Sequence, residues 1–410
     1  MIMMKRNRRA GVEDHWHKTI RQPDGTTTTV PSANNGKGSR WRARYVDENG
    51  REHVKAFRRK ADAQQWLDKQ VSDQITGTWT DPALSGVTFG VVAERWFSTK
   101  ANRSPKTVAG YRSLLDTVVL PRWEKAPMRE VRFDDLQVWI TGLSVDGSVR
   151  FDGKGLSASR VRQAHQLVGA VLKFAVRARH IPANPADGID LPRLPETEQR
   201  FLTHEQLYRV AVASGRMRTL LLVLGYCGLR FGEAAALQVG DVDLQTRRIR
   251  VRRSVTHVAK LGLVEGPTKN HSTRTVPVPA FLACLLETEV TGKDNAALAF
   301  PSRRGDEKYL PLGEARYWFD KAVAVVDGCK GVRIQDLRHT CASLSISAGA
   351  NVKVVQKLLG HKTATLTLDR YGHLFPDDLD AVARALNESA ADDLRTIGAM
   401  TALPLMTKTR

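Results

Sequence analysis

Two segments of the chain hold too much proline and glycine to form helices or strands. Residues 181–196, IPANPADGIDLPRLPE, contain four of the 17 prolines, and residues 77–88 read GTWTDPALSGVT. Proline lacks the backbone donor that a helix or a central strand needs. Both segments therefore predict linkers. They divide the 410 residues into expected domains over 1–85, 86–190 and 197–390, followed by a tail over 391–410.

The first part predicts a small sheet backed by a helix. Residues 1–38 are polar and rich in Gly, Thr and Asn, which predicts a flexible arm with one hairpin. Residues 40–58 begin RWRARYVDENG, where apolar and basic side chains alternate before an Asn49-Gly50 turn, a strong hairpin signal. A helix is expected over 60–76. A sheet with one apolar and one arginine-rich face fits a DNA groove, although an ordinary solvated sheet face explains the same pattern.

The rest of the chain predicts mainly helices. A helical domain is expected over 90–190, with a long amphipathic helix over 157–180. Thr203 and Gln206 have the spacing of a capping box at the next helix start. Period-two hydrophobicity over 247–278 predicts a three-stranded sheet. Further helices are expected over 279–291, 312–326, 335–348, 351–359 and 376–390. The expected fold class is therefore mostly α with small antiparallel β-sheets, in several domains.

Positive charge is spread along the whole chain. The net charge is +20, with +6 over residues 1–85, +7 over 86–195 and +7 over 196–410. This distribution favours a polyanionic partner that every domain touches, most simply nucleic acid, against the alternative of an ordinary basic protein. The longest apolar run, residues 219–229, is too short to span a bilayer, and no signal peptide is visible. A cytoplasmic protein without membrane contact is expected.

The cysteines predict neither a zinc site nor disulfides. None is part of a Cys-x-x-Cys pair, and each lies among apolar residues. Such cysteines are typical of reduced thiols in the cores of cytosolic proteins. They are Cys227, Cys284, Cys329 and Cys341.

Four short motifs hold side chains that are suited to phosphate chemistry. They are GLRFGEAAAL (228–237), PTKNHSTRTVPVP (267–279), RIQDLRHTCAS (333–343) and LGHKTATLTLDRYGHLFP (359–376). In the first motif, Arg230 and Glu233 have helical spacing, so the carboxylate can hold and orient the guanidinium. Each motif alone is weak evidence, because a single arginine, lysine or tyrosine is usually a surface or core residue.

Together, the order Arg, Lys, Arg, His, Tyr over about 140 residues resembles the tyrosine recombinase (phage integrase) family. The spellings GLRFGE, DLRHT and LLGHKTATLTLDRYGHLFP carry this resemblance in residues 200–390. The preceding helical region resembles the core-binding domain of that family. The basic hairpin and helix near 40–75 resemble the arm-binding domain of phage integrases.

The resemblance implies a reaction in which Tyr371 attacks a DNA phosphate. The attack leaves a 3′-phosphotyrosine and a free 5′-hydroxyl, and the covalent link conserves the phosphodiester energy, so no ATP is needed. Arg230 and Arg338 are implied to hold the non-bridging oxygens, as planar and permanently charged forks. Lys269 is implied to protonate the leaving 5′-oxygen.

Two further roles follow from the same resemblance. His361 is implied to donate a hydrogen bond to the phosphate, and Glu233 to brace the arginine site. The physics of the residues agrees, because a tyrosine with a pKa of about 10 needs nearby positive charge to react at neutral pH. No carboxylate cluster suited to two metal ions is visible in the sequence, so we expect cleavage without metal or other cofactor.

The sequence departs from the family pattern at two points, which are Gln335 and the spacing before Tyr371, while His339 is a residue that the family often has too. Gln335 stands where the family usually has histidine, so a hydrogen bond to phosphate is expected to persist while acid–base capacity is lost. His339 is interpreted as a packing or bracing residue. The spacing of ten residues from His361 to Tyr371 is one longer than in many members, which predicts a looser tyrosine segment whose placement depends on a partner subunit.

The leading hypothesis is an integrase that inserts and excises a mobile element. Its implied partners are double-stranded DNA with core and arm-type sites, three further copies of the chain in a tetramer, an accessory excisionase or directionality factor, and a host DNA-bending protein. A dimer-resolving recombinase shares the catalytic set but tends to lack an arm-binding domain. A non-catalytic DNA-binding protein is the third alternative, with Gln335 as a sign of decay.

Overall fold

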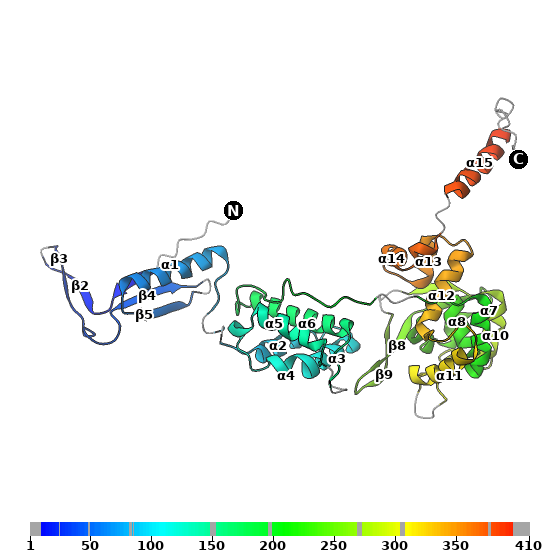
Figure 1. Cartoon of the computed structure of the whole chain (residues 1–410), viewed down its shortest axis with the longest axis horizontal. Coiled ribbons are helices and arrows are strands. Elements are labelled where there is room, and N and C mark those ends of the chain that lie inside the picture. The colour runs from blue at the N-terminus through cyan, green and yellow to red at the C-terminus, as the bar shows by residue number, and fades with distance from the viewer. Residues whose placement is uncertain are drawn as a thin grey trace. The chain divides into compact units, whose positions relative to one another are not determined.

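The structure is a computed structural model, and it describes residues 10–23, 25–47, 50–81, 84, 86–147, 153–195, 199–268, 273–303, 308–375 and 379–396. The chain divides into two units, residues 1–196 and 197–410 (Figure 1). The fold is mostly α with small antiparallel sheets, which confirms the predicted fold class.

A three-stranded antiparallel sheet begins the first unit. Its strand order is β1 (Gly11–Asp14), β4 (Trp41–Val46), β5 (Glu52–Phe57), and α1 (Lys60–Thr76) packs against it. The predicted hairpin over 40–58 is confirmed as β4 and β5, although Asn49 of its turn lies outside the described residues. The predicted helix over 60–76 is α1.

The alternation along β4 is also confirmed. Ala43 and Tyr45 are fully buried, whereas Arg42 and Arg44 are exposed on the other face. The buried face extends further than predicted, because Trp79 of the expected linker is only 6% exposed and donates its indole N–H to the Tyr45 hydroxyl at 2.8 Å. The linker therefore starts after Trp79.

The N-terminal segment is more ordered than the predicted flexible arm. One hairpin is present, formed by β2 (His17–Arg21) and β3 (Thr27–Pro31). In addition, β1 joins the main sheet, where it pairs with β4. The reason is that Val12 packs against the core of the sheet, while Asp14 accepts a hydrogen bond from Arg40 Nε at 3.0 Å.

The remainder of the first unit is a helical bundle with its own apolar core. Its α-helices are α2 (Phe89–Ser98), α3 (Pro105–Leu114), α4 (Leu120–Trp123), α5 (Phe133–Leu143) and α6 (Ala158–Arg177). Helix α6 is the predicted long amphipathic helix. Ile181, Ala186 and Ile189 of the second predicted linker are buried in this core, so that segment packs along the bundle for about half of its length.

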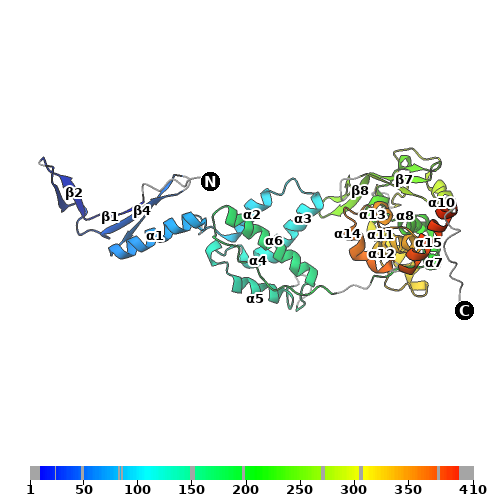
Figure 2. The same cartoon turned by 90° about the horizontal axis from the view of Figure 1, so that it is seen from above.

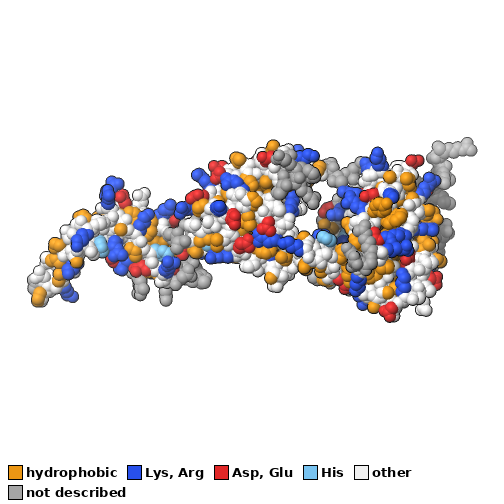
Figure 3. Space-filling view, turned by 90° about the horizontal axis from the view of Figure 1, so that it is seen from below, with side chains coloured by type: hydrophobic (Ala, Val, Ile, Leu, Met, Phe, Trp, Pro, Cys, Tyr) orange, Lys and Arg blue, Asp and Glu red, His pale blue; other side chains and the backbone are white. Residues whose placement is uncertain are grey.

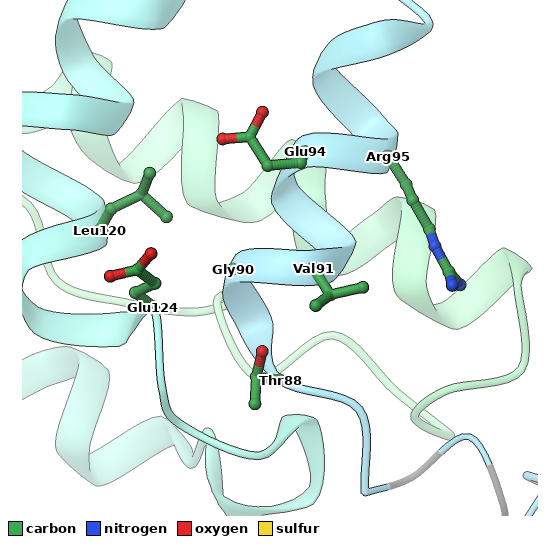
Figure 4. Close-up of a pocket in the computed structure, with 7 residues that line it drawn as sticks. All are labelled: Thr88, Gly90, Val91, Glu94, Arg95, Leu120 and Glu124. Carbon is green, nitrogen blue, oxygen red and sulfur yellow. The ribbon is translucent and has the colours of Figure 1, made fainter.

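A cavity of about 410 Å³ lies between α2 and α4 in this bundle (Figure 4). Gly90 forms part of its wall, and a Cβ there would meet the backbone oxygen of Glu124 at 2.8 Å. Two carboxylates, Glu94 and Glu124, line the cavity together with one arginine, Arg95. This balance of charge does not favour an anionic ligand.

The second unit is built around helix α8 (Arg218–Cys227), whose side chains are mostly buried. Helices α7, α10 and α12 pack around it (Figures 1 and 2). The other helices are α7 (His204–Ala213), α9 (Phe231–Ala235), α10 (Ala280–Val290), α11 (Leu312–Val325), α12 (Ile334–Ser347), α13 (Val352–Leu359), α14 (Thr365–Tyr371) and α15 (Leu379–Thr396). The predicted capping box of Thr203 and Gln206 opens α7.

The predicted three-stranded sheet over 247–278 is wrong, because the segment contributes to two sheets. Strands β7 (Arg248–Val251) and β10 (Arg274–Pro277) pair with each other, and β6 (Val242–Asp243) completes their sheet in the order β10-β7-β6. Strands β8 (Arg253–Val258) and β9 (Gly262–Pro267) form a separate hairpin.

The break between β7 and β8 has a local cause. Arg252 and Arg253 both bind the carboxylate of Asp241, which is 4% exposed. Since a buried carboxylate needs such partners, the two arginines hold the chain at the point where β7 ends and β8 begins.

Two further predictions are corrected by the second unit. The tyrosine segment is not a loose loop, because α14 carries Tyr371 at its last position and Tyr371 is 1% exposed. Cys284 is exposed rather than buried, since α10 turns Leu282, Leu286 and Val290 towards the core and leaves Cys284 on the opposite side. The other three cysteines are free and buried, as predicted.

Two negative findings apply only to the described residues. In that part of the chain, no helix is long and apolar enough to cross a membrane. There too, no group of three or more His, Cys, Asp or Glu side chains is placed to hold a metal ion.

Candidate active site

Glu233 joins two arginines from distant parts of the sequence. Arg230 caps the N-terminus of α9, and its backbone N–H and its Nη1 donate to the Glu233 carboxylate at 2.9 and 2.8 Å. Arg274 of β10 donates to the same carboxylate through both terminal nitrogens, at 3.1 and 2.7 Å. The Glu233 side chain is fully buried, whereas that of Arg230 is 26% exposed. Glu233 therefore fixes Arg230 with its guanidinium partly open to solvent.

The electrostatics of this cluster keep Glu233 ionised. Burial alone raises the pKa of Glu233, but the hydrogen bonds and charges of Arg274 and Arg230 outweigh it and lower the pKa to about 2. A close contact between backbones makes the geometry possible, because a Cβ on Gly232 would meet the carbonyl oxygen of Val255 at 2.3 Å. Gly232, the second glycine of the motif GLRFGE, thus lets α9 approach β8.

Arg338 is buried at the centre of the site. It lies on α12, is 3% exposed, and donates to the carbonyl oxygens of Gly228 and Leu359. These carbonyls end α8 and α13, and Arg338 supplies donors to helix ends that otherwise lack partners. Burial, together with the charge of Arg230, lowers the pKa of Arg338 to about 9, so the guanidinium stays charged at neutral pH.

The hydroxyl of Tyr371 lies 2.7 Å from Nδ1 of His339, within hydrogen-bond distance. The ring of His361 is parallel to the tyrosine ring, with 6.4 Å between centroids and 4° between planes. Burial raises the pKa of Tyr371 to about 12, while the positive charges of Arg338 and Arg370 act in the opposite direction. The resting phenol is therefore protonated at neutral pH.

His361 follows the left-handed Gly360 that ends α13. Its Nδ1 lies 2.9 Å from the Thr367 hydroxyl of α14. Burial, and then the charges of Arg338 and Arg230, lower the pKa of His361 to about 4. The imidazole is therefore neutral at pH 7 and holds one ring proton.

The structure brings most of the predicted site residues together in the second unit. Those that interact through contacts or charges are Arg230, Glu233, Arg338, His361 and Tyr371. Gln335 is exposed on α12, and its side chain makes no hydrogen bond to any residue that the structure describes. Lys269 lies outside the described residues.

Two residues that contact the site were not singled out from the sequence for these roles. Arg274 shares Glu233 with Arg230 and also donates Nε to the Leu358 carbonyl at 3.1 Å. Arg274 lies in the motif PTKNHSTRTVPVP. Its position close to Lys269, as a second basic residue, is the feature of the sequence that could have indicated its role. The sequence predicts a packing or bracing role for His339, whose Nδ1 lies 2.7 Å from the Tyr371 hydroxyl.

A basic cavity of about 900 Å³ opens beside His361. It is lined by Arg274, Thr275, Lys353, Gln356, Lys357, Gly360, His361 and Lys362. Lys353 and Lys357 are one helical turn apart on α13, so they lie on the same face. Lys and Arg side chains are also widespread on the visible faces of both units (Figure 3). The chemistry of this lining favours an anionic ligand next to the tyrosine.

Comparisons with known proteins show which family the second unit resembles. Residues 196–377 match the Phage integrase family. The putative prophage phiRv2 integrase of Mycobacterium tuberculosis is 28% identical over 349 residues, which cover 82% of this chain and 88% of the relative. The tyrosine recombinase XerA of Saccharolobus solfataricus is 29% identical over 267 residues, 64% of this chain and 81% of the relative.

The fold is also similar to that of a solved structure. The Tn1549 transposon integrase, in complex with a circular intermediate DNA, matches with a TM-score of 0.61 at 19% identity, over 74% of this chain and 99% of that one. At this identity, the likeness shows the fold alone. The family match over the second unit, together with the named relatives, supports a site-specific recombinase, a tyrosine recombinase of phage type.

Proposed function

We propose that this recombinase cleaves and rejoins double-stranded DNA through a 3′-phosphotyrosine on Tyr371, and so integrates and excises a mobile element. The observation that carries the proposal is the position of the Tyr371 hydroxyl in the field of Arg338 and Arg230, with His361 beside its ring. A phenol whose pKa is about 12 reacts at neutral pH only where a bound phosphate is polarised and the phenolic proton has an acceptor.

Arg230 and Arg338 are the proposed phosphate-binding pair. Arg230 offers the part of its guanidinium that Glu233 does not occupy, and its side chain is 26% exposed. Arg338 is held by two backbone carbonyls, so its charge is preorganised and needs no rearrangement when the phosphate becomes more negative in the transition state. Lys269 is the proposed donor to the leaving 5′-oxygen, and His361 the proposed donor to a non-bridging oxygen.

The proposed substrate is double-stranded DNA with core and arm-type sites. The basic cavity beside His361 supports a path for the DNA backbone next to the scissile phosphate. The exposed arginine face of β4 supports an arm-binding role for residues 1–85, with core binding by 86–190 and catalysis by 197–390. The name of the structural relative, an integrase in complex with a circular intermediate DNA, is consistent with this substrate.

The proposed assembly is a tetramer of this chain on two duplexes, to which the tail over 391–410 contributes. A directionality factor and a host DNA-bending protein complete the proposed set of partners. The proposed location is the bacterial cytoplasm, at the nucleoid. These proposals rest on the family resemblance and on the basic charge of every part of the chain.

The decisive experiment traps the covalent intermediate. The protein is incubated, with a chelator present, with a nicked duplex that carries the attachment site read from the DNA flanking its gene. We expect a covalent protein–DNA adduct that Tyr371→Phe abolishes. Tyr208→Phe is a matched control, because Tyr208 is half exposed on α7 and belongs to no part of the proposed site. A wild-type protein that binds this duplex and forms no adduct would overturn the proposal.

A further inference from the structure

The hydroxyl of Tyr371 has one hydrogen-bond partner among the residues that the structure describes. That partner is Nδ1 of His339, at 2.7 Å, on the helix that also carries Arg338. The contact joins α12 to the last residue of α14, two helices that both pack on α13 (Figure 1). Tyr371 is 1% exposed, so protein side chains surround most of the phenol.

The position where the family usually has a histidine offers no proton acceptor in this chain. Gln335 has an amide, which cannot titrate, and its side chain is exposed without a hydrogen bond to a described residue. His361 makes no hydrogen bond to the Tyr371 hydroxyl, because its Nδ1 lies on the Thr367 hydroxyl and its ring is parallel to that of Tyr371. His339 is therefore the imidazole whose nitrogen meets the reacting oxygen.

We propose that His339 is the general base that removes the proton from the Tyr371 hydroxyl during DNA cleavage. The inference rests on the proposed function, in which Tyr371 is the nucleophile. A contact of 2.7 Å is within the distance at which a general base acts on its substrate proton. In this chain, the proposed base is His339, which lies four residues after Gln335 and therefore one helical turn further along α12.

The step is balanced in both directions. In cleavage, a bond forms between the Tyr371 oxygen and phosphorus, the bond from phosphorus to the 5′-oxygen breaks, and the phenolic proton moves to Nδ1 of His339. The leaving 5′-oxygen receives its proton from the proposed donor, Lys269. In rejoining, the 5′-hydroxyl attacks the phosphotyrosine, Lys269 regains its proton, and His339 returns a proton to the tyrosine oxygen. No net proton, metal or redox partner is required.

The surroundings of His339 keep it able to accept a proton. Burial lowers its pKa, so the ring is neutral at pH 7. The proposed role requires the single ring proton on Nε2, which leaves Nδ1 to accept from the phenol. Positive charges nearby act in the same direction, and a carboxylate acts against them. The charged and titratable groups that face it are Arg333 at the N-cap of α12, Asp336 and Arg338 on α12, His361 after α13, and Arg370 and Tyr371 on α14.

The test is the rate of adduct formation in His339→Gln, measured with the nicked substrate at saturating DNA from pH 5 to pH 10. Glutamine can still hydrogen-bond the hydroxyl and brace it, but it cannot take its proton. We expect a loss of roughly 100-fold or more at pH 7. The remaining rate should rise about tenfold per pH unit, because hydroxide then removes the proton of a phenol whose pKa is about 12.

A second histidine–tyrosine pair supplies the matched control. His204 Nδ1 lies 2.9 Å from the Tyr226 hydroxyl, on the exposed surface between α7 and α8. We expect His204→Gln to leave the rate and the pH profile unchanged. If His339→Gln reacts within twofold of the wild type with the same profile, His339 only braces Tyr371 and the inference is overturned.

The wild-type profile tests the inference even if the variant fails to fold. The rate should fall as the pH drops through the lowered pKa of His339, below its ordinary value of 6.5, and should be level above it. A wild-type rate that climbs tenfold per unit up to pH 10 would mean that hydroxide is the base, and would overturn the inference. A wild type without any adduct would instead overturn the proposed function.

Discussion

Replacing Glu233 with glutamine removes the charge that holds Arg230 and Arg274 together and keeps the side-chain shape. In the wild type, the buried carboxylate accepts from both arginines, at 2.8 Å from Arg230 and at 3.1 and 2.7 Å from Arg274. In Glu233→Gln, an amide faces two guanidinium groups, and one half of the amide is itself a donor. Breaking a buried ion pair by removing one partner is strongly destabilising.

The size of the effect follows from the pKa of Glu233. Its value of about 2 in the folded chain lies below the ordinary 4.5, so the carboxylate stabilises the fold above pH 4.5 and this contribution is lost as pH falls towards 2. A difference of this size corresponds to about 3 kcal/mol at pH 7. The same relation gives a loss of about 1 kcal/mol by pH 4 and about 2 kcal/mol by pH 3. The wild type and Glu233→Gln should therefore converge in stability as the solution is acidified.

The assay is urea unfolding of the chain labelled with 5-fluorotryptophan. Trp318 is the sole tryptophan after residue 196, so its fluorine resonance reports on the second unit alone. Glu205→Gln is the matched control, since its ion pair with Arg209 is exposed and should change the free energy of unfolding by less than about 0.5 kcal/mol. A difference between wild type and Glu233→Gln below about 1 kcal/mol at pH 7, or one that stays constant down to pH 3, would refute the reasoning.

Two further predictions concern the DNA. Gln335→Ala should slow adduct formation about tenfold, because a hydrogen bond to a charged phosphate is lost. Gln335→His should keep or raise the rate. An alanine variant as fast as wild type would exclude the glutamine from the chemistry. Lys357→Ala, in the basic cavity, should weaken DNA binding and reduce the slope of log affinity against log salt by about 1, with the adduct rate at saturating DNA unchanged. Binding titrations at several salt concentrations measure this, and an unchanged slope would remove Lys357 from the DNA path.

Local sequence was sufficient for most of the secondary structure. The strand alternation of β4, the capping box at Thr203 and the amphipathic period of α6 each depend on neighbours within a few residues. The ion pair of Arg230 and Glu233 was equally accessible, because three residues separate its members. The boundaries of the linkers were harder to predict from the sequence. Trp79, for example, packs in a core that includes residues far away in the sequence.

The sequence alone determined which side chains are available for the chemistry. They include the arginines, the glutamine in the histidine position and the tyrosine. Their partners depended on contacts across the fold. Arg274 meets Glu233 across 41 residues, and His339 meets Tyr371 across 32. Such pairs form only when α12, α13, α14 and β10 pack around α8 and α9, because no local periodicity relates them. The motif therefore predicted a tyrosine that reacts with phosphate, and the packing of three helices decided which imidazole its hydroxyl meets.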